Sequence, residues 1–418
     1  MTEFQKEPAA CGAAQGFVFA GAKSVFALLF LINLFNYIDR QVLYAVFPLI
    51  KSDLGISDAA LGLLASAFML VYLAASPGIG YLADRGPRQK LIAASALLWS
   101  FATMAGAAVR NYGHLLFARS FIGIGEAGFT AISPSFVAEY FPAARRARVL
   151  ALFTMALPMG SALGYLLGGK LGQAFGWRAA FMMVGVPGII LGVLAFALRD
   201  PRRQAGRAAQ AGPDWRQYLE FFRNRPFMYA CLSLAMSTFT LGGFAAWAPT
   251  FFTRYYGMSV GKAGLVFGIM TVLAGSAGTL LGGWAADWLH EKTDRAYFII
   301  TAAALLLSLP FLITGLAADS LPVALTALVI AEILVFVNIA PMNAAVVACT
   351  DLSVRSMAFA LNVFIIHILG DAVSPTIIGI LSDRFGLRCA MLACCVMLVA
   401  GSWFAVKGAR SVESDGGA

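Results

Sequence analysis

The chain has 418 residues, of which 60% are hydrophobic and 12% charged, and its mean hydropathy is +0.80. Soluble domains carry about 25% charged residues, so this composition excludes an ordinary soluble protein. The net charge of +9 would suit a nucleic-acid-binding protein, but the distribution of the basic residues along the chain argues against that function.

Twelve stretches of mostly apolar residues follow one another, and each is long enough to cross a bilayer as a helix. Together they occupy nearly the whole chain and leave no room for a soluble catalytic domain. The sequence therefore predicts an all-α membrane protein with twelve transmembrane helices. Their expected ranges are 23–48, 57–83, 90–109, 114–139, 149–171, 179–198, 227–252, 260–286, 296–317, 321–349, 356–381 and 387–406.

One long polar stretch divides these helices six and six. Gly80-Tyr-Leu-Ala-Asp84 ends the second span and Gly283-Trp-Ala-Ala-Asp287 ends the eighth, so the second half echoes the first. Such a parallel repeat predicts two pseudo-symmetric six-helix bundles with a substrate site between them. The expected divisions are an N-terminal tail (1–22), an N-terminal bundle (23–198), a linker (199–226), a C-terminal bundle (227–406) and a C-terminal tail (407–418).

The basic residues predict the orientation. If the N-terminus is cytoplasmic and the helices alternate, 20 of the 30 Lys and Arg residues lie inside, 8 lie outside, and Arg40 and Arg119 lie in the membrane. This asymmetry follows the positive-inside rule and requires no nucleic-acid partner. We expect a multi-pass protein of the cytoplasmic (inner) membrane with both termini inside. The first 22 residues lack the pattern of a cleaved signal peptide, so the first helix is expected to direct insertion.

Several motifs resemble the signatures of the major facilitator superfamily. They are the loop from Gly80 to Lys90, the Arg119-x-x-x-Gly123 run, and the glycines at every fourth position from Gly160 to Gly168. The loop departs from the usual pattern at Pro87, where glycine is common. A closer resemblance, over about residues 36–200, is to the spinster family of lipid transporters. It rests on Asn36-Tyr37-x-Asp39-Arg40, Gly80-Tyr81-Leu82-x-Asp84-Arg85, Gly125-Glu126-Ala127 with Ser133-Pro134, and Pro158-x-Gly160-Ser161-x-Leu163-Gly164-Tyr165.

The resemblance implies a conformational-switch role for the loop after the second helix, through Gly80, Asp84, Arg85 and Arg88. Gly80 would let helices approach closely, and Asp84 could accept hydrogen bonds at a neighbouring helix N-terminus. A charged turn that merely obeys the positive-inside rule is the alternative. The glycines of the fifth helix are interpreted as a packing stripe.

Charged side chains within the first and fourth helices are the candidate site. An ion in the bilayer centre costs at least about 2.5 kcal/mol, so it is rare without a partner or a function. The resemblance implies that Asp39, Arg40 and Glu126 form a cluster facing the central cavity. We expect Asp39 and Glu126 to couple protons, because a carboxylate that alternates between a dry and an arginine-paired state exchanges protons. Arg40, with Asn36, Tyr37 and Arg119, is expected to bind substrate, since a guanidinium suits phosphate or carboxylate. A structural salt bridge remains the alternative.

A possible second site lies in the C-terminal half. His367 and Asp371 are four residues apart and share a helix face, so they could form a proton relay or a packing pair. Glu332 could pair with His367. Aromatic side chains recur in these helices. Most are explained as lipid-facing or core residues, but some could line a slot for an acyl chain; they are Phe239, Phe244, Trp247, Phe251, Phe267, Phe336 and Phe364.

These features predict a monomeric secondary transporter that moves an amphipathic lipid, of the lysophospholipid or sphingoid-phosphate type, by proton-coupled alternating access. Its expected partners are the substrate, protons and membrane lipids. A proton-coupled carrier of hydrophobic drugs or small organic anions is the alternative. No nucleotide-binding loop is present, no cofactor or metal is expected, and Cys389, Cys394 and Cys395 lack the spacing of a zinc site. A lipid enzyme is disfavoured because the three histidines are scattered and no catalytic constellation is found.

Overall fold

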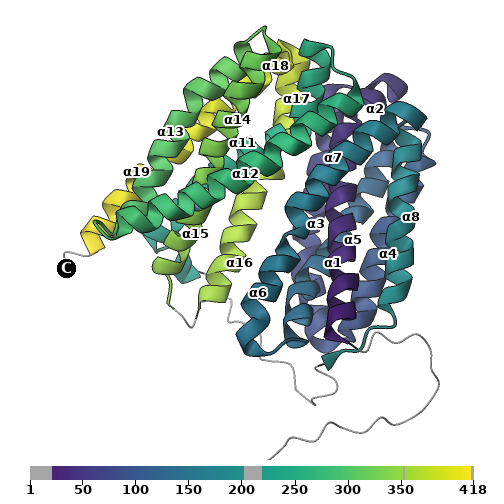
Figure 1. Ribbon diagram of the computed structural model, residues 1–418, viewed down its shortest axis with the longest axis horizontal. Coiled ribbons are helices and arrows are strands. Elements are labelled where there is room, and N and C mark those ends of the chain that lie inside the picture. The colour runs from purple at the N-terminus through teal and green to yellow at the C-terminus, as the bar shows by residue number, and fades with distance from the viewer. Residues whose placement is uncertain (1–20, 202–218, 352–353, 416–418) are drawn as a thin grey trace, which may run out of the picture.

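The computed structural model describes residues 21–201, 219–351 and 354–415 of the chain, without the side chains of Asp84, Ser356 and 413–415 (Figure 1). Most of the expected N-terminal tail, residues 202–218 of the expected linker and the last residues of the C-terminal tail therefore lie outside the described part. Within it the chain is helical, and twelve spans are long and apolar enough to cross a membrane. The predicted all-α membrane fold is confirmed.

The N-terminal half contributes six of these spans. Their apolar composition explains why they form helices in a membrane, where every backbone polar group has to be satisfied within the segment. The helices are α1 (Ala22–Ala45), the short α2 (Phe47–Leu54), α3 (Asp58–Arg85), α4 (Arg88–Ala107), α5 (Tyr112–Glu139), α6 (Ala143–Thr154), α7 (Ala156–Phe175) and α8 (Trp177–Ala195).

The C-terminal half contributes the other six. Its helices are α11 (Arg225–Tyr256), α12 (Val260–His290), α13 (Ala296–Ala317), α14 (Leu321–Val337), α15 (Ile339–Ala348), α16 (Arg355–Ile366), the π-helical turn η1 (His367–Asp371), α17 (Ser374–Phe385), α18 (Leu387–Ala393) and α19 (Cys395–Asp415). Figure 1 shows the two halves as bundles side by side, with the N-terminal bundle in purple to teal and the C-terminal bundle in green to yellow.

Five of the predicted apolar stretches are interrupted. The first breaks at Val46 between α1 and α2, the fifth at Met155 between α6 and α7, the tenth at Asn338 between α14 and α15, and the twelfth at Cys394 between α18 and α19. The eleventh passes through η1 between α16 and α17. The breaks at Val46, Met155 and Cys394 lie among apolar residues, so hydropathy gives no sign of them, whereas those at Asn338 and η1 coincide with polar side chains.

The glycine stripe of the fifth span packs against α1. A Cβ atom added at Gly160, Gly164 or Gly168 would lie 2.7–2.8 Å from atoms of α1, including the carbonyl oxygens of Leu34 and Ile38. Such distances are too short for a real Cβ, so only glycine allows the two backbones to approach this closely. The packing places α1, with Asp39 and Arg40, in the middle of the N-terminal bundle.

The two bundles meet at the end of the molecule that carries α2, opposite the connection between the halves. There α3 packs on α17, and α7 packs on α12. A Cβ at Gly62 would lie less than 3.0 Å from the carbonyl oxygen of Pro375, and one at Gly264 less than 3.0 Å from that of Tyr165. We call this end the joint end and the other the connection end. In Figure 1 the ribbons of α6 and α16 diverge towards the connection end.

Candidate functional site

A cavity of about 290 Å³ lies between the two bundles, near the middle of the spans. Its wall is polar on both sides: α1 contributes Arg40 and Gln41, and η1 contributes His367 and Asp371. Gln41 Nε2 donates to the Ser161 hydroxyl at 3.4 Å, which joins α1 to α7 beside the cavity. The lining residues are Tyr37, Arg40, Gln41, Tyr44, Met69, Tyr72, Leu157, Ser161, Gly242, Ala245, His367 and Asp371.

Arg40 forms an ion pair with Glu126 of α5. Its Nε and Nη2 atoms both donate to Oε2 of Glu126, at 3.2 and 2.7 Å. The Arg40 side chain is 14% exposed, whereas that of Glu126 is fully buried behind it. The guanidinium also lies 5.4 and 5.6 Å from the ring centres of Tyr37 and Tyr72. The arginine is therefore the member of the pair that a substrate in the cavity meets.

Asp39 points away from the cavity, into the N-terminal bundle. Its Oδ2 accepts a hydrogen bond of 2.7 Å from the Thr103 hydroxyl of α4, and the residue is 3% exposed. At 3.6 residues per turn, the cavity-lining residues Tyr37, Arg40, Gln41 and Tyr44 share one face of α1, and Asp39 lies on the opposite side of the helix. Asn36 is fully buried as well. Of the cluster that we expected to face the cavity, only Arg40 lines it.

Arg119 of α5 is buried and does not line the cavity. Its guanidinium lies 5.3 Å from the centre of the Phe68 ring, and that of Arg40 lies 4.9 Å from the same centre. Aromatic faces attract cations at such distances. The ring of Phe68 thus contacts both arginines. Neither Phe68 nor Thr103 was predicted as a site residue, because apolar and hydroxyl side chains are common in membrane helices.

His367 and Asp371 are paired on the opposite wall, as their spacing allowed. Nδ1 of His367 lies 2.8 Å from Oδ1 of Asp371, and their side chains are 27% and 21% exposed. Both belong to η1, in which Gly370 has non-helical angles (φ −100°, ψ −107°). Single π-helical turns in membrane and soluble helices are frequent at functional sites.

Glu332 lies apart from this pair, inside the C-terminal bundle. Its Oε1 accepts from the Thr271 hydroxyl of α12 at 2.8 Å, so the suggested pairing with His367 is not formed. Beside it is an apolar cavity of about 20 Å³, lined by Phe244 and Met270 among others. Phe244 is one of the seven aromatic residues expected at an acyl-chain slot, and this cavity has room for about one water molecule.

The residues expected to act together in the loop after α3 lie in different surroundings. Arg88 is buried, and its guanidinium binds Glu139 at 2.6 Å and Asp200 at 2.5 Å, which holds three segments of the N-terminal bundle together. Arg85 is exposed and lies over the Tyr81 ring. A Cβ at Gly80 would meet no atom within 4 Å, because the bundles are apart at this end. The side chain of Asp84 lies outside the described part.

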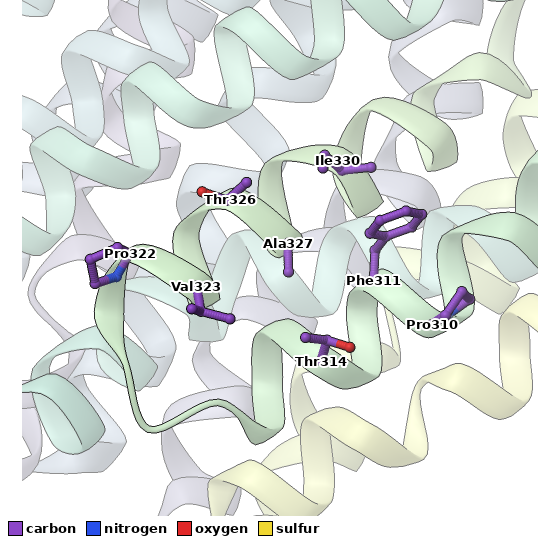
Figure 2. A pocket seen from close by; sticks show the side chains of 8 residues that line it. All are labelled: Pro310, Phe311, Thr314, Pro322, Val323, Thr326, Ala327 and Ile330. Atoms are coloured by element: carbon purple, nitrogen blue, oxygen red, sulfur yellow. The ribbon is translucent and has the colours of Figure 1, made fainter.

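Another cavity lies away from these residues. A groove of about 490 Å³ lies between α13 and α14, where Phe311, Thr314 and Ala327 point into the space between the two helices (Figure 2). Apart from the hydroxyls of Thr314 and Thr326 its walls are apolar, and it carries no charged side chain that could bind a headgroup. Among the described residues no group of three or more His, Cys, Asp or Glu side chains could hold a metal ion.

This arrangement of two six-helix bundles with a charged cavity between them is that of a secondary transporter. The Major Facilitator Superfamily sequence profile matches residues 29–375. In a structural comparison the chain superposes on a bacterial homologue of the human lysosomal transporter spinster, in an inward-facing and unoccupied conformation. The TM-score is 0.85 at 25% identity, over 94% of this chain and 98% of the other.

Similarity to named proteins identifies the family within this superfamily. The chain is 33% identical to the protein spinster of Drosophila melanogaster over 84% of its own length and 60% of that protein, which is therefore considerably longer. It is 33% identical to protein spinster homolog 1 of Homo sapiens over 86% of its length and 73% of that protein. The sphingosine-1-phosphate transporter SPNS2 of Mus musculus is 30% identical over 93% of this chain and 77% of that protein. The chain belongs to the spinster family of major facilitator transporters.

It follows that the protein is a multi-pass membrane transporter for a small molecule, and not an enzyme, as the sequence predicted. The resemblance seen in residues 36–200 extends over most of the chain.

Proposed function

We propose that the protein carries a lysophospholipid or sphingoid phosphate across the membrane by proton-coupled alternating access. The observation that carries this proposal is the Arg40–Glu126 pair, with the arginine in the cavity and the carboxylate buried behind it. A guanidinium binds a phosphate through two hydrogen bonds. The name of the mouse relative, sphingosine-1-phosphate transporter, supports a phosphate-bearing lipid.

The same pair supplies a route to proton coupling. A phosphate that binds Arg40 competes with Glu126 for the guanidinium. A buried carboxylate without its partner is costly, so Glu126 takes up a proton when the arginine turns to the substrate. Its second oxygen, Oε1, has no hydrogen-bond partner among the described residues and can carry that proton. Oδ1 of Asp39 is in the same situation, which supports a proton-coupling role for both acids.

In this proposal the two bundles move as units, with boundaries near 23–198 and 227–406, about the cavity. Asn36, Tyr37 and Arg119 support Arg40. The protein works as a monomer in the cytoplasmic membrane with both termini inside, as the distribution of basic residues predicts. The loop after α3 then lies at the cytoplasmic end, where it would pack when the bundles close. Its expected switch residues are Gly80, Asp84, Arg85 and Arg88.

A carrier of small organic anions is the second candidate. The cavity of about 290 Å³ lies at the lower limit of ordinary ligand sites, about 300–1,000 Å³, which favours a small solute over a whole lipid. In that case Arg40 binds a carboxylate, and the proton chemistry of Glu126 is unchanged.

Binding to the purified protein tests the proposal. A lysophospholipid, sphingosine-1-phosphate and citrate would be titrated into wild-type protein and the Arg40→Ala variant, with proton uptake recorded in weak buffer. Lipid binding with proton uptake, both lost without Arg40, is the expected result. Binding of citrate alone by folded protein would overturn the lipid carrier and leave the second candidate.

A further inference from the structure

The cavity carries opposite charges on its two walls. Among the described residues that line it, Arg40 is the one Lys or Arg and Asp371 the one Asp or Glu. Arg40 belongs to α1 of the N-terminal bundle, and Asp371 belongs to η1 of the C-terminal bundle. Both side chains are accessible, at 14% and 21% exposure.

The charge of Asp371 is not neutralised by a permanent cation. In the described part of the chain its ion-pair partner is His367, whose Nδ1 is 2.8 Å from Oδ1. A neutral imidazole donates a hydrogen bond to one carboxylate oxygen without cancelling the charge. By contrast, Oε2 of Glu126 accepts a hydrogen bond from the guanidinium of Arg40. An acidic side chain within a membrane span marks a functional site in general, and among the described residues no Lys or Arg is paired with this one.

The local backbone holds Asp371 at the cavity wall. Gly242 of α11 lies so close that a Cβ there would come within 3.0 Å of the Asp371 side chain, and a Cβ at Gly370 would lie 2.9 Å from Thr238. These two glycines let η1 press against α11. The close contact of the two backbones keeps η1, and Asp371 with it, at the wall of the cavity.

We propose that Asp371 binds the primary ammonium group of a zwitterionic lysolipid headgroup whose phosphate binds Arg40. The inference rests on the proposed lipid-carrier function and assigns to Asp371 the recognition of the amine in the headgroup. An ammonium donates charge-assisted hydrogen bonds to the free carboxylate oxygen. Because the two partners lie on different bundles, such a headgroup touches both at once, whereas a simple anion touches only the Arg40 side.

The test compares two lysolipids that differ only in the amine. Lysophosphatidylethanolamine and its N-acetylated form have the same acyl chain and the same phosphodiester, but the second lacks the ammonium. Their affinities for the purified protein in detergent would be measured at about pH 8, above the ordinary titration range of histidine. We expect wild type to prefer the free amine by about tenfold, the effect of one charge-assisted hydrogen bond.

Asp371→Asn should abolish this preference without weakening the N-acetylated lipid, and Asp371→Glu should restore it in part. Arg40→Gln should weaken both lipids. Asp319→Asn, a control at an exposed acid, should keep the wild-type preference, and elution from size exclusion checks the folding of each variant.

Equal binding of the two lysolipids by wild type, or an undiminished preference in a folded Asp371→Asn protein, would overturn the assignment of Asp371 while the lipid carrier stands. Failure of both lysolipids to bind the folded wild type, with binding of citrate, would overturn the proposed function as well.

Discussion

Arg254 of α11 binds Asp58 of α3 through both terminal nitrogens, each 2.6 Å from a carboxylate oxygen, and so joins the two bundles. Asp58 also accepts from Lys51 at 2.5 Å and from the Ser382 hydroxyl of α17 at 2.5 Å. In return, Asp383 of α17 accepts from the backbone N–H of Asp58 at 2.8 Å. This network lies at the joint end, and it holds the bundles in the conformation seen here.

Asp58→Asn should therefore loosen the joint end. The variant loses two ion pairs, one of them between the bundles, so the equilibrium shifts towards the conformation that is open at that end. Ser66 of α3 is bonded to Thr376 of α17 across the joint at 2.7 Å. A cysteine at position 66, in a protein without other cysteines, should react with a maleimide at least about fivefold faster in the variant.

The control for this experiment is Asp53→Asn. Asp53 lies at the same end but pairs with Arg178 at 2.6 Å within the N-terminal bundle, and this hydrogen bond holds the pKa of the Asp53 carboxyl below its ordinary value. Its loss should leave the labelling rate unchanged. An equal rate in wild type and Asp58→Asn would show that the ion pairs do not hold the joint.

Two alanine substitutions should shift the same equilibrium in opposite directions. At Gly62 a methyl group collides with the Pro375 carbonyl oxygen and drives α3 from α17, whereas at Gly80 it meets open space in this conformation. Closure of the connection end would bury Gly80 against a neighbour if the loop is the conformational switch. Gly62→Ala should therefore raise labelling at position 66, and Gly80→Ala should lower it. A shift in the same direction for both would contradict the switch.

Glu126→Gln should remove the coupling of headgroup binding to protons. The glutamine leaves Arg40 without an ionic competitor, so a lysophospholipid should bind several-fold more tightly and without proton uptake. A pH-indicator dye in weakly buffered protein measures the protons per lipid bound. Glu291→Gln changes an exposed acid at the end of α12 and should behave as wild type. Undiminished proton uptake by Glu126→Gln would assign the proton to another group.

Asp39→Asn separates a proton site from a structural lock. An asparagine can still accept the Thr103 hydrogen bond through its amide oxygen, so the fold should survive while proton-linked transport is lost. Thr103→Val removes the same hydrogen bond and keeps the carboxylate; it should lower the melting temperature and retain coupling. If Asp39 only locks the bundle, transport will follow stability in both variants.

Arg88→Ala should destabilise the protein more than Arg85→Ala does. Removal of the buried Arg88 leaves Glu139 and Asp200 without their shared cation, and loss of one partner of a buried ion pair costs about 3–5 kcal/mol. Arg85 is exposed, and changes at such positions usually lie within about 0.5 kcal/mol. Thermal melting in detergent compares the two. Equal melting temperatures would contradict a structural role for Arg88.

The number of spans and the close packing of the glycine face of α7 followed from the sequence, because apolar length and glycine spacing are local signals. The identity of its partner helix, α1, did not. The direction in which the Asp39 side chain points did not follow from the sequence either. Four residues in a row carry the motif from Tyr37 to Arg40, and only the packing of α1 against α7 and α8 decides which of them face the cavity.

The contacts at the joint end could not be predicted from the sequence for a different reason. Asp58, Arg254 and Ser382 lie at span ends that are far apart in the chain, where an acid, a base and a hydroxyl are ordinary. Nothing local indicates that they meet. His367 and Asp371 are the contrasting case, since both partners lie on one turn and their spacing alone indicated the pair.

The glycine contacts between α3 and α17 also bear on how tightly the carrier is sealed. Where backbone rests directly on backbone, as at Gly62 and Pro375, no side chain can rotate aside to admit water. A direct backbone contact between two helices has no partly open form and is lost only when the whole helices move apart. We therefore expect little passive leakage of protons between transport cycles, a property that a cell maintaining a proton gradient requires of every carrier in its membrane.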